Sequence, residues 1–68
     1  MPHVAKVVTI IGSSPESFAK AADAAVQEAA KTLRGIEGMD ILETSALVQD
    51  DSIKEYQTHV RIRFRIER

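Results

Sequence analysis

The residues with the greatest chemical capacity lie at the C-terminal end of the sequence, where polar and apolar side chains alternate. Between Ile53 and Arg68 this period-two pattern predicts a β-strand with two different faces. The polar series is Glu55, Gln57, His59, Arg61, Arg63 and Arg65, and the apolar series is Tyr56, Thr58, Val60, Ile62, Phe64 and Ile66. The apolar series indicates a face that packs into a core, so the function depends on what the polar face contacts.

Three arginines of the polar series allow two interpretations. Arg61, Arg63 and Arg65 can bind the phosphate or carboxylate groups of a ligand, or they can pair with acidic side chains of a neighbouring strand or subunit. We favour the second interpretation, for which three carboxylates are available, those of Asp40, Glu43 and Glu55. Gln57 is equally ambiguous, because its amide matches the edge of a heterocycle but is also suited to water.

Catalytic and metal-binding patterns are weak in this sequence. A serine nucleophile needs an adjacent base, whereas Ser13 and Ser14 lie between a glycine and a proline, where a turn that starts a helix explains them better. The two histidines, His3 and His59, fall in different predicted strands without a carboxylate at a recognised ligand spacing. We therefore expect neither an enzyme nor a metal site, and we interpret both histidines as surface residues.

Length and composition favour assembly into an oligomer. The 68 residues predict one domain spanning the whole chain (1–68), and a domain near that size hides only about 60% of the surface of its unfolded chain. Disulfides and thiolate zinc sites are excluded because there is no cysteine, and aromatic residues make up only 4% of the chain. We therefore expect self-assembly to supply the additional stability.

Charge and hydropathy argue against two other classes of partner. With a net charge of −1, the chain has no cationic field that would attract nucleic acid or an anionic membrane. The N-terminal residues lack the charged leader and apolar run of a secretory signal, and no apolar stretch reaches the roughly 20 residues that span a bilayer. The sequence therefore predicts a soluble, cytoplasmic protein.

Two elements are predicted in the first half of the chain. Val4–Ile11 is rich in β-branched residues and predicts a strand, and from Glu16 to Arg34 apolar residues recur at three- and four-residue steps, as in an amphipathic helix. Ser14 is the expected N-cap of this helix and Gly35 its C-cap. The apolar stripe is mostly alanine, which allows close approach to a sheet but supplies little apolar area, and this again favours contacts with other subunits.

A hairpin follows, in which Met39–Val48 is a second strand and Gln49–Ser52 the turn into the polar strand. The fold class is then α+β, with the order strand-helix-strand-strand and a three-stranded antiparallel sheet packed on one helix, if the last strand is central. Asp50 and Asp51 in the turn could bind calcium, but the alternating oxygen ligands of a calcium loop are absent and a solvated turn is the expectation.

Several segments of the chain resemble the dodecin family. They are Thr9–Phe18 (TIIGSSPESF), Thr32–Arg34 at the predicted helix end, and Glu55–Thr58 (EYQT) followed by Phe64. The resemblance covers nearly the whole chain and includes its length and element order. It implies a hollow homododecameric sphere of identical subunits with a non-catalytic role in binding and storing a small molecule.

The resemblance also implies a flavin site at the interface between subunits. In flavin-binding dodecins a Trp at the start of the second strand stacks on the isoalloxazine ring, and a Gln in the last strand hydrogen-bonds the ring edge. The Gln corresponds to Gln57. The Trp corresponds to Gly38, which has no side chain, so a stacking contact worth about 1–3 kcal/mol is missing. Ser45 corresponds to a ligand-directed Arg, Arg65 matches a basic position suited to a phosphate tail, and Met39 is an expected apolar wall. The implied cofactor is FMN or a riboflavin-type flavin.

The start of the chain also resembles the calcium dodecins, a branch of the family without the stacking Trp. The segment that carries this resemblance is Ile10–Phe18. It leaves an alternative open, in which the protein is a calcium dodecin-like or ligand-free structural assembly that does not bind flavin. In that case the polar strand face serves subunit contacts.

Overall fold

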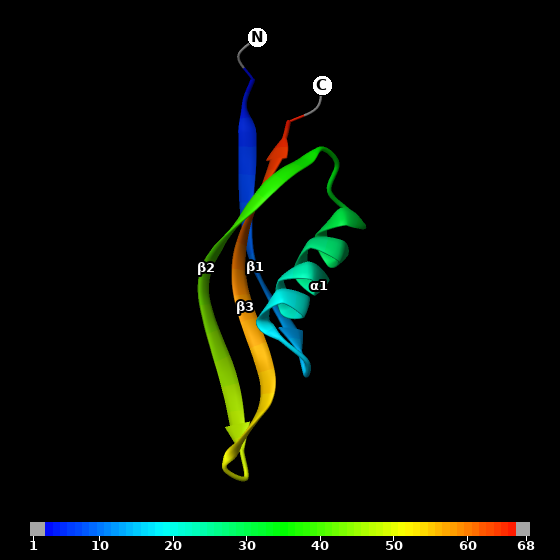
Figure 1. Cartoon of the computed structure of the whole chain (residues 1–68). Coiled ribbons are helices and arrows are strands. Elements are labelled where there is room, and N and C mark those ends of the chain that lie inside the picture. Colours follow the sequence, from blue (N-terminus) through cyan, green and yellow to red (C-terminus); the bar gives the residue numbers. More distant parts are fainter. Residues whose placement is uncertain (1–2, 67–68) are drawn as a thin grey trace.

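The computed structural model describes residues 3–66, which form one helix and three strands (Figure 1). In chain order the elements are β1 (Ala5–Ser14), α1 (Phe18–Ala30), β2 (Ile36–Gln49) and β3 (Ser52–Arg65). The predicted order of strand, helix, strand, strand is confirmed. Glu67 and Arg68, which the predicted last strand included, lie outside the described residues.

The strands form an antiparallel sheet in the order β1-β3-β2, so the polar strand is central as expected. The β2–β3 hairpin extends well beyond α1 and makes the molecule elongated, with principal extents of 52 × 20 × 13 Å (Figure 1). Its turn consists of Asp50 and Asp51 with φ angles of 54° and 63°, the pair of left-handed residues that a tight two-residue hairpin requires. The predicted turn at this position is confirmed.

α1 covers one face of the sheet (Figure 1), and the core between them is small. The helix contributes Ala22, Ala25 and Ala29, and β3 contributes Val60 and Ile62, whose side chains are fully buried. Six partly buried apolar residues surround this cluster, namely Val8, Ile10, Val26, Leu33, Ile36 and Met39. The prediction of an alanine-rich stripe against the apolar face of the last strand is confirmed.

Close packing of α1 on the sheet depends on two residues. A Cβ atom at Gly12 would collide with the carbonyl oxygen of Ala21 in α1, so only glycine allows β1 to approach the helix this closely. On β3, the buried hydroxyl of Thr58 donates a hydrogen bond of 2.8 Å to the carbonyl oxygen of Phe18. The first turn of the helix is thus fixed to the central strand.

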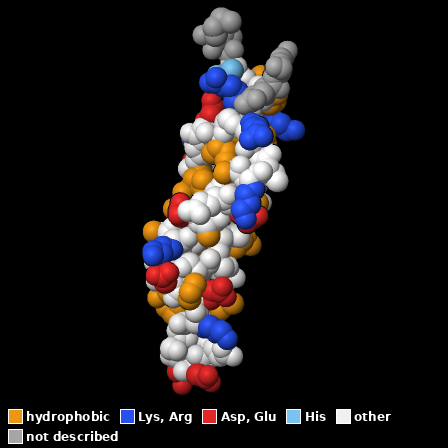
Figure 2. All heavy atoms as spheres, turned by 90° about the vertical axis from the view of Figure 1, so that its right-hand side faces the viewer, with side chains coloured by type: hydrophobic (Ala, Val, Ile, Leu, Met, Phe, Trp, Pro, Cys, Tyr) orange, Lys and Arg blue, Asp and Glu red, His pale blue; other side chains and the backbone are white. Residues whose placement is uncertain are grey.

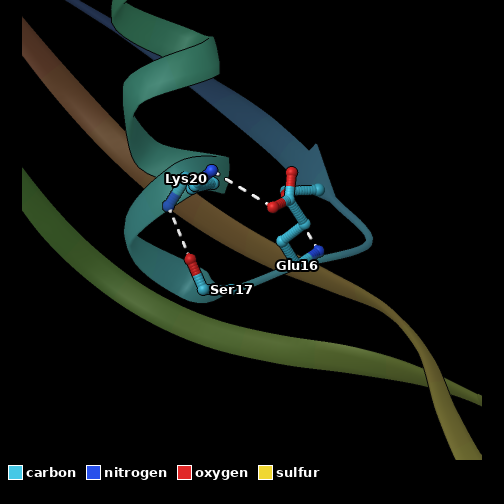
Figure 3. Close-up of polar contacts among 4 residues, drawn as sticks. Glu16, Ser17 and Lys20 are labelled. Atoms are coloured by element: carbon cyan, nitrogen blue, oxygen red, sulfur yellow. Dashed lines mark hydrogen bonds and ion pairs between the residues drawn. The ribbon is translucent and has the colours of Figure 1, made fainter.

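The predicted N-cap of the helix is wrong. The N-cap is Ser17, whose Oγ accepts a hydrogen bond of 3.0 Å from the backbone N–H of Lys20 (Figure 3). The hydroxyl oxygen of Ser14 accepts instead from the backbone N–H of Glu16 at 3.0 Å, within the turn that precedes the helix. The helix therefore begins at Phe18 and not at Glu16.

The helix also ends earlier than predicted, at Ala30 with Lys31 as its C-cap. The backbone N–H groups of Thr32 and Leu33 both donate to the carbonyl oxygen of Ala29, which tightens the chain and ends the regular helix. Gly35 does adopt a left-handed conformation, with φ 70°, but it lies in the connection to β2 and is not the helix cap.

Many apolar side chains remain at the surface. Figure 2 shows hydrophobic side chains in patches over the visible face, interspersed with charged ones. The large hydrophobic residues with exposed side chains are Val4, Val7, Ile11, Phe18, Ile41, Leu42, Leu47, Val48, Ile53 and Ile66. For a chain with so small a core, this is a large apolar surface left without cover.

Candidate functional site

The face of the sheet opposite α1, which we call the open face, carries the polar series of β3. Because successive side chains of a strand alternate, the burial of Thr58, Val60 and Ile62 under α1 directs the residues between them to this face. Their cross-strand neighbours lie beside them. On β2 these neighbours include Gly38, Asp40, Glu43 and Ser45, and on β1 they include Val7, Thr9, Ile11 and Ser13.

Ser45 joins two polar residues of β3 on the open face. Its hydroxyl Oγ lies 3.4 Å from Oε1 of Gln57 and 3.3 Å from Nε2 of His59. Nε2 of His59 also lies 3.8 Å from a carboxylate oxygen of Glu43. The side chains of Ser45, Gln57 and His59 are half-buried, and that of Glu43 is exposed. Together they form a short row of connected polar groups on the open face.

The arginines of β3 pair with carboxylates of β2. Asp40 Oδ2 accepts from Nη1 of Arg63 at 2.9 Å and from Nη2 of Arg61 at 3.3 Å, and Arg65 Nη2 lies 3.1 Å from Glu37 Oε2. The hydrogen bond from Arg63 is the main cause that lowers the pKa of Asp40, and the bond from Arg61 adds to it, although partial desolvation opposes both. The favoured interpretation of the ladder as ion pairs with a neighbouring strand is therefore confirmed for Asp40. Arg65 pairs with Glu37, which was not predicted, and within residues 3–66 no arginine pairs with Glu43 or Glu55.

Arg63 occupies the space in front of Gly38. A Cβ atom built on Gly38 would collide with Nη2 of Arg63 and would lie 3.2 Å from its Cζ. The guanidinium thus lies where a side chain at position 38 would begin. Gly38 has no left-handed φ angle, so its backbone admits other residues and the obstacle is the Arg63 side chain alone.

The structure brings together only some of the residues that the sequence predicted for a flavin site. Ser45 and Gln57 are in contact, and Gly38 lies near the other end of the open face, in register with Arg63. Gln57 precedes Arg63 by six positions in β3, which corresponds to about 20 Å at about 3.3 Å per residue. Within one subunit, therefore, Gly38 and Gln57 do not face a common small ligand.

The remaining two predicted residues differ in position. Arg65 extends beyond Arg63 along β3 and lies on the open face, paired with Glu37. Met39, however, packs against the alanine-rich core with Ile62 as its cross-strand partner, on the face that α1 covers. It does not form the apolar wall of a site on the open face.

Sequence analysis treated His59 only as a surface residue, and it named Arg63 and Glu43 as possible ion-pair groups without assigning their partners. Their partners could not be read from the pattern, because the β2–β3 register shifts between Ile41 and Glu43. This shift sets Glu43 opposite His59 and Ser45 opposite Gln57. The contacts of the open face thus depend on an irregularity that has no clear sequence signal.

Across residues 3–66, no group of three or more His, Cys, Asp or Glu side chains is arranged to hold a metal ion. In the same part of the chain, no helix has the length and apolar character needed to cross a membrane.

Comparison with known proteins identifies the family of this chain. The family model described as Dodecin matches residues 4–67. This chain belongs to the dodecin family. A curated dodecin from Thermus thermophilus is 34% identical over 67 residues, which are 98% of this chain and 97% of that protein.

Solved dodecin structures share the fold. The dodecin from Streptomyces coelicolor superposes with a TM-score of 0.94 at 26% identity, covering 97% of this chain and 94% of that chain. The dodecin from Streptomyces davaonensis gives a TM-score of 0.95 at 25% identity, with both chains fully covered. The predicted fold class and the resemblance to dodecins are both confirmed.

Proposed function

We propose that this dodecin is a non-catalytic binding and storage protein that assembles as a homododecamer and takes up a flavin, FMN or riboflavin, at the open face. The observation that carries the proposal is the state of the Gln57 amide. It is half-buried among the strands and its Oε1 accepts from Ser45, while its Nε2 donates no hydrogen bond to any of residues 3–66. An amide whose oxygen is engaged and whose donor is free suits the polar edge of a heterocycle.

Assembly and ligand binding are linked in this proposal. Gly38 and Gln57 are too far apart in one subunit to contact the same ring, so a ligand that touches both must lie between two copies. The exposed apolar side chains and the small alanine-rich core support self-association, because burial of this surface supplies the stability that one subunit lacks. The cytoplasmic location expected from the sequence stays a prediction, which fractionation of cells would check.

The proposal is tested by native mass spectrometry and by flavin titration of the same preparation. We expect a homododecamer that quenches riboflavin fluorescence. Gln57→Ala is expected to bind about 2- to 10-fold more weakly, the effect of a lost neutral hydrogen bond. Gln49→Ala, at the exposed end of the β2–β3 hairpin, is a matched control that is expected to keep the affinity. The proposal would be contradicted if the protein is a monomer, or if an excess of the protein leaves the fluorescence of riboflavin unchanged.

A second candidate is a calcium dodecin-like or ligand-free structural assembly. It is favoured by one observation, the Arg63 guanidinium in front of Gly38, which fills space that a stacked ring would use. In this case Arg63→Ala is expected to weaken the assembly, while riboflavin has no effect on its thermal stability. Calorimetric titration with calcium chloride separates the calcium-binding form of this candidate from the ligand-free form.

A further inference from the structure

We propose that His59 is a positioning residue which decides, through Ser45, whether Gln57 presents a hydrogen-bond donor or an acceptor to a ligand. A protonated His59 sets the amide NH2 group of Gln57 outward, whereas a neutral His59 whose Nε2 carries no proton sets the carbonyl oxygen outward. The inference rests on the proposed function only where it concerns a bound ligand, whose affinity would depend on whether Gln57 offers a donor or an acceptor. The hydrogen-bond relay itself belongs to the unliganded protein.

The relay follows from the single proton of the Ser45 hydroxyl. Ser45 Oγ lies 3.4 Å from Gln57 Oε1 and 3.3 Å from His59 Nε2, so both neighbours are within hydrogen-bond reach. A hydroxyl can donate only one hydrogen bond, although it can accept from other groups at the same time. Ser45 therefore cannot donate to Gln57 and to His59 together, and the state of one neighbour determines the bond to the other.

Protonation of His59 gives the first arrangement. Nε2 then carries a proton and donates to Ser45 Oγ, which leaves the hydroxyl proton for Oε1 of Gln57. With its oxygen engaged, the amide directs Nε2 of Gln57 and its two protons away from Ser45. The outward group is a donor.

Neutral His59 permits the opposite arrangement. When the ring proton resides on Nδ1, Nε2 is an acceptor and takes the hydroxyl proton of Ser45. Oε1 of Gln57 would then face an oxygen without a proton between them, so the amide turns over and its NH2 group donates to Ser45 Oγ. The outward group is now an acceptor, and the two arrangements differ in what a ligand meets.

The surroundings of His59 allow the imidazole to change charge. Glu43 on β2 lies 3.8 Å from Nε2 and attracts the imidazolium, while Arg61 follows two positions along β3 and repels it. The neighbour on β1 is the uncharged Ile11, and α1 lies on the other face of the sheet. The His59 side chain is 25% exposed, so protons reach it from solvent.

The relay is tested without any ligand by nuclear magnetic resonance of the Gln57 side-chain amide, identified from its loss in Gln57→Ala. We expect its resonances to shift between about pH 5 and about pH 8 together with those of the His59 ring. In Ser45→Ala the resonances of the Gln57 amide are expected to stay constant over the same pH range. A Gln57 amide that does not move in the unmodified protein, or moves equally in Ser45→Ala, overturns the inference.

Riboflavin titration then measures the consequence for binding. Riboflavin is the suitable probe because it lacks the phosphate of FMN, whose charge changes near pH 6. Its polar ring edge carries more acceptors than donors, so we expect about fivefold tighter binding at about pH 5.5 than at about pH 8, the value of one neutral hydrogen bond. His59→Gln and Ser45→Ala should bind with an affinity independent of pH. If the unmodified protein binds riboflavin with the same affinity at every pH, the inference is contradicted. If it binds no riboflavin at any pH, the proposed function is contradicted, and the resonance experiment alone decides whether the relay exists.

Discussion

In the folded chain the guanidinium of Arg63 lies directly over Gly38, where any side chain at that position would begin. A Cβ atom on Gly38 would collide with Nη2 of Arg63, and the same guanidinium is held through Nη1 by Asp40 at 2.9 Å. The two positions thus compete for one volume on the open face. A larger residue at position 38 can be accommodated only if the flexible end of Arg63 moves away.

This relationship predicts the effect of Gly38→Trp. The indole would displace the Arg63 guanidinium toward solvent, where about half of that side chain already is, and would present an aromatic face to a flavin. Stacking of an aromatic side chain on a heterocyclic base contributes about 1–3 kcal/mol, so riboflavin should bind about 5- to 150-fold more tightly. Fluorescence quenching of riboflavin measures the gain.

Gly38→Ala is the matched control for this substitution. Its methyl group displaces the Arg63 guanidinium without adding an aromatic ring, and we expect riboflavin affinity to stay within about twofold of the unmodified protein. An equal gain in both variants would show that removal of Arg63 from this space, and not stacking, controls the affinity. No gain in Gly38→Trp would place the ligand elsewhere on the assembly.

Asp40 predicts how stability depends on pH. In the folded protein the pKa of Asp40 lies below its usual value of 3.8, chiefly because Arg63 donates to the carboxylate. Because the pKa is lower in the folded state, the ion pairs stabilise the fold fully above the usual pKa of 3.8, and this stabilisation is lost as pH falls through the lowered pKa. Asp40→Asn should therefore lower the melting temperature at about pH 6 and lower it less at about pH 3.

The control for Asp40→Asn is Asp23→Asn on the exposed surface of α1. Asp23 accepts a hydrogen bond from Gln27, which an asparagine oxygen can still accept. We expect its effect on the melting temperature to be small at both pH values. If the two variants lost the same stability at about pH 6, the ion pairs of Asp40 with Arg61 and Arg63 would contribute nothing beyond a general charge effect.

Most of the fold could be predicted because it depends on patterns with a fixed period. Alternation along β3 separated the buried Val60 and Ile62 from the polar face, and the alanine spacing located the covered side of α1. The start of the helix could not be predicted, because Ser14 and Ser17 are residues of the same type and both are suited to the N-cap position. The hydrogen bond from Thr58 to the Phe18 carbonyl, 40 positions away, accompanies the later start.

The candidate site was less accessible to sequence analysis than the fold. Met39 was expected to form an apolar wall of the site that includes Gly38. Adjacent residues of a strand point to opposite faces, however, and Met39 contributes to the core. The contacts of Ser45 with Gln57 and His59 depend on register shifts in β2, which a pattern of residue types does not reveal.

Gly12 predicts the cost of separating β1 from α1. In Gly12→Ala the new methyl group would collide with the backbone carbonyl oxygen of Ala21, and because both partners are held in regular elements, the helix must shift. Overpacking of this kind costs about 1–3 kcal/mol, so we expect a clearly lower midpoint of urea unfolding. Gly38→Ala meets only the flexible end of Arg63, so it should lose at most the small contribution of the exposed ion pair between Arg63 and Asp40. Equal midpoints for the two variants would contradict the close approach of helix and strand.

The hairpin turn predicts a stabilising substitution. Asp51 has a φ angle of 63°, a left-handed conformation that costs an L-residue about 1–2 kcal/mol, less for aspartate, and costs glycine almost nothing. Asp51→Gly produces the Asp-Gly pair that this type of turn prefers, and we expect a gain of about 0.5–1 kcal/mol in the free energy of unfolding. Ser52→Gly is the control, because Ser52 lies within β3 outside the left-handed region, where glycine weakens the strand. Stabilisation by both glycines would point to relief of strain along the whole hairpin, whereas the structure confines the left-handed residues of this hairpin to Asp50 and Asp51.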